Sequence, residues 1–313
     1  MFEKILQQIK KYDSIVLFGH IDPDPDCFGS QVALKESLLT AYPNKHVFVV
    51  GSGCPNFFAL LGRPDLIDKE TACQSLGVIL DGNGKDRMEE NICYFCKEFV
   101  KIDHHIETSE FSDGPSVVDT NSSSTCELIY RFLVESKLPI TETVANALYA
   151  GILTDTGRFN YVNDYAGLFG ITKELCSYGA NPVAINKALN VINENELAFK
   201  GYILTHYKKS DLGILYILLN EKVLSKYKIS SNVAHHYVNL LSNVKGYKIW
   251  LLGLPTDQGD YHYEIRSTGA DIQKVAVKYG GGGHKCAAGY SIPEFSKSNF
   301  DDLLNSLHAC LKE

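Results

Sequence analysis

The sequence predicts an α/β protein with two domains, in which a mostly parallel sheet with helices on both faces is followed by a smaller α/β domain. In the first part of the chain, short apolar runs alternate with helical segments, a pattern typical of parallel sheets covered by helices. From about residue 193, a polar helix-forming segment leads into a second series of strands and helices. The chain has 313 residues, a length typical of about two domains.

The first domain, residues 1–190, is predicted from apolar runs of strand length and from residues that can cap helices. Its N-terminal segment indicates an amphipathic helix with Phe2, Ile5 and Ile9 on one side. The hydroxyl residues at 122–125 and Thr141 can cap two later helices. The expected strands are 14–19, 46–50, 77–81, 98–102 and 116–118, and the expected helices are 28–40, 87–97, 125–136, 141–153, 166–178 and 182–189.

The second domain, residues 191–313, is expected to begin with a connecting helix that starts in the polar segment 193–196. Alternating apolar segments then predict a second α/β unit, with a run of four glycines at 280–283 before its last strand. The expected strands are 213–219, 247–254, 260–267 and 288–292, and the expected helices are 232–241, 271–279 and one from 296 onward.

The composition limits the classes of protein to be considered. The net charge of −7 argues against tight binding of long duplex nucleic acid, which usually requires an excess of Lys and Arg. No apolar run approaches the roughly 18 residues that span a bilayer, and the N-terminus lacks the layout of a signal peptide. We therefore expect a soluble cytoplasmic protein. The nine cysteines lack disulfide spacing, and we interpret the Cys93 and Cys96 pair as two small apolar residues on one helix face.

Six metal-capable side chains follow apolar runs at separate places in the chain. Carboxyl ends of parallel strands meet at one crevice, so these side chains are expected to lie close together. Four carboxylates in one pocket would repel one another, and two divalent cations would remove that repulsion. Carboxylate and imidazole ligands favour Mn²⁺ or Mg²⁺, although zinc competes for such sites. The predicted ligands are His20, Asp24, Asp26, Asp81, His104 and Asp155.

A simpler interpretation exists for each of these residues taken alone. An aspartate after a strand is usually a helix cap or a turn residue, and a single histidine is usually structural. The chain also contains His235-His236, which we assign to an amphipathic helix without a metal. Cys27, beside Asp26, is interpreted as a small apolar filler. The combination of six ligands in one pattern favours the metal cluster.

Five motifs in order give the chain a resemblance to a known family. They are GHIDPDPDCFGS at 19–30, Asp81 with Arg87, Asp103-His104-His105, GILTDTGRF with Asp155, and GGGGHKCAAG at 280–289 preceded by Arg266. This order resembles the DHH/DHHA1 phosphoesterases, in particular the nanoRNase/pAp-phosphatase branch. The resemblance covers nearly the whole chain. Pro25 stands where the family often has glycine, which suggests a stiffer loop between Asp24 and Asp26.

The resemblance implies a role for each residue of the first domain. One metal would be held by His20 and Asp24, and Asp81 would bridge the two metals. The other metal would be held by Asp26, His104 and Asp155. Three further residues are implied in catalysis: Asp103 would orient an imidazole, and His105 and Arg87 would neutralise charge on the phosphoryl oxygens.

The glycine-rich segment of the second domain is the expected substrate-binding element. Glycines allow close backbone approach and leave N–H groups free for an anion. Residues 261–290 hold four Lys or Arg against two acids, a local excess that suits a phosphate. The resemblance implies that this segment grips the terminal phosphate of the substrate. The substrate-binding residues carried over are Arg266, Gly282, Gly283 and His284.

These expectations predict a two-metal phosphohydrolase that degrades short oligoribonucleotides, dephosphorylates 3′-phosphoadenosine 5′-phosphate, or does both. The expected cofactors are two Mn²⁺ ions, with Mg²⁺ as the alternative. A cyclic or linear dinucleotide phosphodiesterase, a polyphosphatase or pyrophosphatase, and a degenerate nucleotide-binding module without activity stay open. The expected partner is short RNA or a small nucleotide, with no long duplex nucleic acid and no membrane. Whether the chain forms a homodimer stays open as well.

Overall fold

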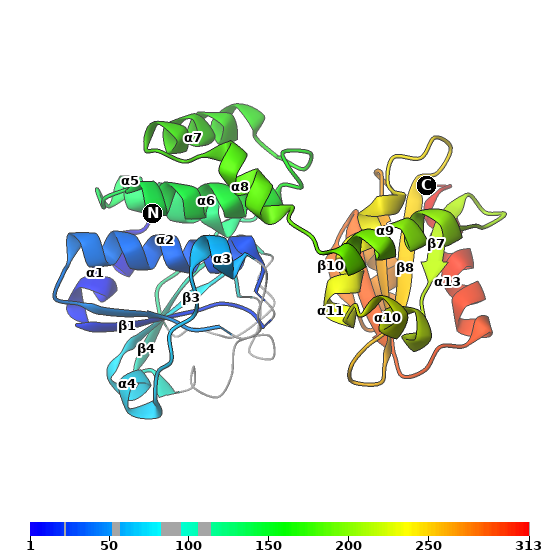
Figure 1. The fold of residues 1–313 in the computed structure, drawn as a ribbon. Coiled ribbons are helices and arrows are strands. Elements are labelled where there is room, and N and C mark those ends of the chain that lie inside the picture. The colour runs from blue at the N-terminus through cyan, green and yellow to red at the C-terminus, as the bar shows by residue number, and fades with distance from the viewer. Residues whose placement is uncertain (22, 52–56, 83–94, 106–113, 313) are drawn as a thin grey trace. The chain divides into compact units, whose positions relative to one another are not determined.

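The computed structural model describes residues 1–21, 23–51, 57–82, 95–105 and 114–312. The chain divides into two compact units, Met1–Val191 and Ile192–Glu313, which are joined by one chain segment (Figure 1). Each unit has hydrophobic cores of its own. Within the described part of the chain, no helix combines the length and the apolar composition that crossing a bilayer requires.

The first unit is built on a five-stranded sheet in which every pairing is parallel. Its strands are β1 Ser14–Phe18, β2 His46–Val49, β3 Leu76–Leu80, β4 Glu98–Asp103 and β5 Ser116–Val118. The order is β2-β1-β3-β4-β5, so the direction of the chain along the sheet reverses between β1 and β3. Ligands of such open sheets bind at the carboxyl ends of the strands where the order reverses.

Helices cover both faces of this sheet, which confirms the predicted class. On one face, α2, α5 and α6 pack against one another and share the main core of the unit with α1 (Figure 1). On the other face, Ala72 of α4 packs on Val16, Phe18 and Ile79. The helices are α1 Glu3–Lys11, α2 Pro25–Ala41, α3 Phe58–Leu61, α4 Lys69–Gln74, α5 Thr125–Glu135, α6 Glu142–Asp155, α7 Tyr165–Ser177 and α8 Pro182–Leu189. The helix expected at 87–97 falls largely in 83–94, outside the described residues.

Helix α2 begins three residues earlier than the sequence pattern predicts. Asp24 is its N-cap, and Oδ1 of this residue accepts hydrogen bonds from the backbone N–H groups of Asp26 and Cys27, both at 2.9 Å. Pro25 occupies the first helical position, where its fixed φ is favourable and its missing N–H would have no partner in the helix. The expected stiff loop between Asp24 and Asp26 is therefore wrong, because these residues form the start of a helix.

The second unit contains a six-stranded mixed sheet in the order β10-β11-β9-β8-β7-β6. Strands β7 and β8 pair in parallel, and all other pairs are antiparallel. Helices α12 and α13 share a core with one face, and α9, α10 and η3 with the other. The strands are β6 Lys208–Lys209, β7 Ile214–Leu218, β8 Ile249–Pro255, β9 Tyr261–Ser267, β10 Gly282–His284 and β11 Ala287–Ile292. The helices are α9 Glu194–His206, α10 Glu221–Tyr227, α11 Ser231–Ala234, the 3₁₀ helix η3 His235–Leu241, α12 Gln273–Lys278 and α13 Lys297–Cys310.

Two details of this unit differ from the sequence prediction. The helix expected at 232–241 is α-helical only as far as Ala234 and continues as a 3₁₀ helix that packs Val238 and Leu241 into the core. Helix α10 is not predicted, although Asn220 caps it by accepting a hydrogen bond from the N–H of Val223 at 3.1 Å. In both places, packing on the sheet determines the local structure more than the apolar spacing does.

A buried ion pair lies near the carboxyl end of β4. Lys101 and Asp103 are two positions apart in the strand and so lie on the same face of the sheet. Lys101 Nζ is 3.1 Å from Asp103 Oδ2, and both residues are almost completely removed from solvent. Loss of one partner of such a pair leaves an uncompensated buried charge.

We therefore expect Lys101→Met to lower the free energy of unfolding by about 3–5 kcal/mol. The change removes the cation beside Asp103 Oδ2, and urea denaturation followed by circular dichroism measures the loss of stability. The double variant Lys101→Met/Asp103→Asn should recover much of it, since neither partner is then charged.

Lys11→Met is the matched control for this experiment, because Lys11 pairs with Glu98 of the same strand at 2.8 Å but both side chains are solvent-exposed. It should cost no more than about 1 kcal/mol. A Lys101→Met variant as stable as this control would contradict the assigned importance of the buried pair.

Candidate metal centre

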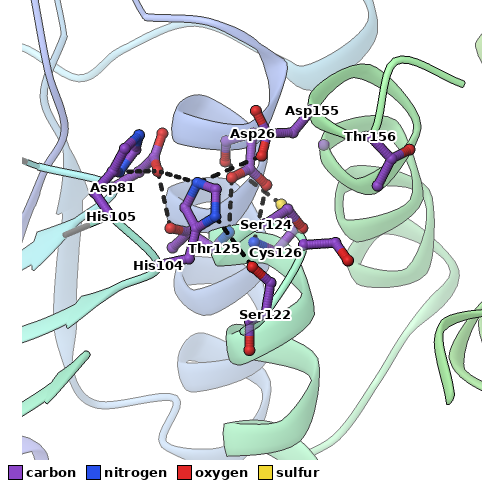
Figure 2. Close-up of polar contacts among 12 residues, drawn as sticks. Asp26, Asp81, His104, His105, Ser122, Ser124, Thr125, Cys126, Asp155 and Thr156 are labelled. Carbon is purple, nitrogen blue, oxygen red and sulfur yellow. Dashed lines mark hydrogen bonds and ion pairs between the residues drawn. The ribbon is translucent and has the colours of Figure 1, made fainter. Parts of the chain in front are cut away.

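The carboxyl edge of the first sheet brings together side chains from distant parts of the chain (Figure 2). His20 follows β1, Asp81 follows β3, and His104 follows β4. Asp26 lies in the first turn of α2, while Asp155 is the last residue of α6. The apolar run before Asp155 belongs to a buried helix, as the expected helix 141–153 predicts, and packing of this helix against α2 takes its carboxylate to the strand ends.

Asp81 lies at the centre of these side chains. Its Oδ1 is 3.6 Å from His104 Nε2, and its Oδ2 is 3.6 Å from His20 Nε2. These separations exceed the roughly 2.7–3.2 Å of a hydrogen bond. They match the roughly 3.0–3.6 Å expected between two ligands that each lie about 2.1 Å from the same cation. Asp81 has a left-handed backbone (φ 56°), which aspartate tolerates better than most residues.

Both imidazoles are held so that Nε2 is the atom available to a metal. His20 Nδ1 is 2.8 Å from the carbonyl oxygen of Ile21, and His104 Nδ1 is 3.3 Å from that of Ser122. Since a carbonyl only accepts hydrogen bonds, each Nδ1 carries the proton. The lone pair of the neutral ring then lies on Nε2, which is the arrangement that metal-binding histidines adopt.

A second group of ligand atoms contains Asp26, His104 and Asp155, which lie within 4.8 Å of one another. His104 Nε2 is 3.4 Å from Asp155 Oδ2. Asp26 accepts the backbone N–H groups of Thr125 (2.7 Å) and Cys126 (2.9 Å) at the start of α5, where the helix dipole favours a negative charge. Such groups could hold a divalent cation.

Gly151 of α6 makes the close approach of α2 possible. A Cβ atom at this position would lie 2.8 Å from Asp26 Oδ1 and 2.3 Å from Cys126 Sγ. Any larger residue would therefore displace the carboxylate from its place beside Asp155.

The groups of ligand atoms among the described residues contain Cys27 but not Asp24. One carboxylate oxygen of Asp24 caps α2, and no group of three ligand atoms within 4.8 Å among the described residues includes Asp24. Cys27 Sγ instead forms such a group with His20 and Asp81. This thiol is not among the ligands predicted from the sequence, where its small size favoured the role of an apolar filler. Its place in the first turn of α2, beside Asp26, is the signal that could have identified it.

The crowding of carboxylates changes their protonation. Burial raises the pKa of Asp26 and of Asp155 well above its ordinary value, and the neighbouring carboxylates raise it further. Burial opposes the ionisation of Asp81 as well, but His20, His105 and His104 offset this and lower its pKa. Asp81 is thus the permanently ionised member. Bound cations would take the place of the protons on Asp26 and Asp155.

His20 and Cys27 lie on the other side of Asp81. Burial lowers the pKa of His20, but Cys27, Asp81 and Asp24 together raise it above its ordinary value. Burial raises the pKa of Cys27 to about 12, so the thiol is protonated at neutral pH without a metal. We therefore attribute the raised pKa of His20 mainly to the carboxylates.

Asp103 is joined to His105 by two hydrogen bonds. Its Oδ1 accepts hydrogen bonds from His105 Nδ1 at 2.8 Å and from the backbone N–H of His105 at 3.1 Å. Burial lowers the pKa of His105, yet Asp103 and Asp81 raise it overall. The imidazole therefore tends to carry a second proton on Nε2. Arg87, the other predicted catalytic residue, lies outside the described residues.

The predicted substrate-binding residues lie on adjacent strands of the second unit. Arg266 of β9 is paired with Ala287 of β11, which is paired in turn with His284 of β10. Gly282 and Gly283 belong to the edge strand β10, which is not among the strands predicted from the sequence. Gly283 has φ 126°, and a Cβ there would lie 2.4 Å from the carbonyl oxygen of Ala287, so the tight hairpin itself requires this glycine.

The raised pKa values of Asp26 and Asp155 predict how pH acts on the metal-free protein. The two protonated carboxyl groups contribute fully to the stability of the folded state below pH 3.8. This contribution is lost as pH rises through their pKa values in the folded protein. Since cations would replace these protons, Mn²⁺ should raise the melting temperature relative to EDTA by more at high pH. We expect the gain to be about 4 °C larger near pH ~8 than near pH ~5, measured by thermal denaturation.

Asp155→Asn provides the control, since an amide does not titrate and should flatten this pH dependence. A gain from Mn²⁺ that is the same at both pH values in the unaltered protein would contradict the assignment.

Comparison with known proteins agrees with the two-unit architecture. Residues 14–152 match the DHH family, N-terminal domain, and residues 214–313 match the DHHA1 domain. The crystal structure of an exopolyphosphatase-related protein from Bacteroides fragilis has the same fold, with a TM-score of 0.89 over 100% of this chain and 97% of that chain at 23% identity.

Two curated proteins are similar in sequence over nearly the whole chain. The bifunctional oligoribonuclease and PAP phosphatase NrnA of Bacillus subtilis is 31% identical, covering 100% of this chain and 99% of its own length. The protein of the same name from Mycoplasma pneumoniae is 32% identical, covering 90% of this chain and 88% of its own. These matches confirm the resemblance carried by the five motifs: the chain belongs to the DHH/DHHA1 family of phosphoesterases.

Proposed function

We propose that this protein is a two-metal phosphohydrolase that degrades short oligoribonucleotides and removes phosphate from 3′-phosphoadenosine 5′-phosphate. The observation that carries the proposal is the convergence of His20 Nε2 and His104 Nε2 on the buried carboxylate of Asp81, at distances suited to shared cations. The activities named for the Bacillus subtilis and Mycoplasma pneumoniae relatives support the choice of substrate.

The donor atoms fit two divalent cations. His20 and Asp81 would hold one, with Asp24 and Cys27 close by in the chain, and Asp26, His104 and Asp155 would hold the other. Asp81 would belong to both, because its two oxygens contact different imidazoles. When bound, the cations supply Lewis acidity to the phosphoryl group and to water. The predominance of oxygen and nitrogen donors favours Mn²⁺, with Mg²⁺ as the alternative.

His105 would act directly on the phosphoryl group. Asp103 accepts the proton of Nδ1, so the ring would act on the substrate through Nε2. The raised pKa of His105 favours a proton on that atom. The imidazolium can then donate to a phosphoryl oxygen as negative charge develops on it. Asp103 would keep the ring in this orientation.

The second unit would bind the end of the nucleotide that does not react. Arg266 and His284 occupy one row across three strands, and the surrounding residues 261–290 carry an excess of basic side chains. A terminal phosphate bound there contributes binding energy remote from the reacting bond, which can be used for positioning. This binding favours short substrates, because the additional phosphates of a longer substrate would meet a chain that is acidic overall.

Asp81→Asn should abolish the metal centre while leaving a folded protein. The amide keeps an oxygen that can accept the hydrogen bond from Thr125 Oγ1, now 2.9 Å from Asp81 Oδ1, but it lacks the charge that two cations share. We expect kcat to fall by about 100-fold or more. Elemental analysis should find fewer than two Mn²⁺ per chain.

Asp68→Asn serves as the control, since Asp68 caps α4 and asparagine caps equally well. Near-normal turnover by Asp81→Asn on all substrates would show that the proposed two-metal site is not the site of reaction.

Substrate length should matter strongly. Beyond about five nucleotides, additional phosphates find few Lys or Arg on an acidic protein, and kcat/KM per end should fall steeply. The measurement is a series of 5′-labelled RNAs from ~2 to ~24 nucleotides, assayed with Mn²⁺. Mononucleotides should be the product. A flat profile, or a preference for the longest RNA, would instead indicate a processive exonuclease.

A further inference from the structure

Strand β9 carries a row of three polar side chains on one face. His262, Glu264 and Arg266 alternate with Tyr261, Tyr263 and Ile265, which are buried in the core on the opposite face. The polar row is only partly exposed: the Glu264 side chain retains 15% of its accessible surface and that of Arg266 retains 23%. Charged side chains that are this far removed from solvent need partners, and here the partners lie within the row.

Hydrogen bonds connect the row from one end to the other. His262 Nδ1 is 3.0 Å from Ser291 Oγ on β11, and His262 Nε2 is 3.1 Å from Glu264 Oε2. The other oxygen of Glu264, Oε1, accepts a hydrogen bond from Arg266 Nη1. The neutral form of His262 satisfies both contacts, with Nε2–H donating to the carboxylate and Nδ1 accepting from the serine hydroxyl. Glu264 is thus held at both of its oxygens.

We propose that Glu264 is a positioning residue, which fixes the guanidinium of Arg266 so that it binds the terminal phosphate of the substrate. The inference rests on the proposed function, in which Arg266 grips that phosphate. Glu264 itself does not touch the substrate; it acts through Arg266.

The geometry of Arg266 supports this role. Two contacts hold its Nη1: the hydrogen bond to Glu264, and one of 3.0 Å to the backbone carbonyl oxygen of Ile265. Both contacts engage the same nitrogen, so they fix the plane of the guanidinium. The N–H groups of Nη2 and Nε take no part in these two contacts. A guanidinium presents five donors in a planar fork and binds phosphate in a bidentate manner. Prior fixation of a long side chain reduces the entropy lost on binding.

Gly289 is part of the same arrangement. A Cβ at this position would lie 2.9 Å from His262 Nε2 and 3.0 Å from the carbonyl oxygen of Tyr263. The imidazole therefore lies directly over the backbone of β11, and only glycine leaves room for it. This contact gives the last glycine of the segment 280–289 a role separate from phosphate binding.

Glu264 also has an effect that opposes binding, because its negative charge weakens the attraction between Arg266 and a phosphate. The nearby histidines of η3 do not compensate for it, since burial lowers the pKa of His235 and lowers that of His236 to about 4. The two effects predict opposite results when the carboxylate is removed. If orientation dominates, binding weakens; if charge dominates, binding becomes stronger.

Steady-state kinetics of the full-length, Mn²⁺-loaded enzyme decides between them. The substrates are 3′-phosphoadenosine 5′-phosphate and bis(p-nitrophenyl) phosphate, which lacks a terminal phosphate. We expect Glu264→Ala to raise KM for the nucleotide by about 10-fold, in the range of a lost charge-assisted hydrogen bond, with kcat changed little. Glu264→Gln, which can still accept from Nη1, should stay within about threefold of the unaltered enzyme. kcat/KM on the artificial diester should not change.

The double variant Glu264→Ala/Arg266→Ala shows whether the carboxylate acts through the guanidinium. We expect its KM to equal that of Arg266→Ala alone, because the two residues act as one unit. His262→Ala should change KM in the same direction as Glu264→Ala but less, which provides a second variant if Glu264→Ala folds poorly. Glu221→Ala, at an exposed position of α10 in the same unit, controls for the loss of one negative charge.

The outcomes separate this inference from the proposed function. If Arg266→Ala leaves the nucleotide KM unchanged, the proposed phosphate grip is wrong. If Arg266→Ala raises KM but Glu264→Ala lowers it or leaves it unchanged, the grip stands and the positioning role is overturned. Additive effects in the double variant, or an equal loss on the artificial diester, would also overturn it.

Discussion

The electrostatic balance around Asp81 is the constraint on which the first unit depends. Its carboxylate is buried, yet three imidazoles keep it ionised, and the carboxyl groups of buried Asp26 and partly exposed Asp155 lie beside it. Three carboxyl groups this close together cannot all be ionised without compensating positive charge. The metal-free protein meets this requirement with protons on Asp26 and Asp155. Divalent cations would meet it in place of these protons, with the carboxylates as their ligands.

The secondary structure is arranged to hold this balance in place. The parallel sheet delivers Asp81 and His104 from neighbouring strand ends, and helix packing delivers Asp26 and Asp155 from above them (Figure 2). Asp26 also joins two helices, because it belongs to α2 while its oxygens accept N–H groups at the start of α5. The ligands are thus fixed by rigid elements, as an accurate site requires.

Much of the fold and of the candidate metal centre could be predicted from the sequence. The features that could not be predicted have identifiable physical causes. The strands were predictable because central parallel strands are buried on both faces and read as continuous apolar runs. The meeting of Asp155 with Asp26 was not, since it depends on the packing of α6 against α2, which apolar spacing within one segment does not indicate. No local sequence pattern indicates that Lys101 is buried or that Glu264 forms an ion pair with Arg266. Both are contacts between alternate residues of one strand, and their importance depends on burial that only the folded sheet creates.

The sharing of Asp81 between two cations is the central claim, and anomalous diffraction from crystals grown with Mn²⁺ tests it most directly. The account predicts two anomalous peaks about 3.5–4 Å apart, the separation typical of two-metal phosphoryl-transfer sites. One peak should lie beside His20 Nε2 and the other beside His104 Nε2, with an oxygen of Asp81 close to each. A single peak, or two peaks of which only one contacts Asp81, would contradict it.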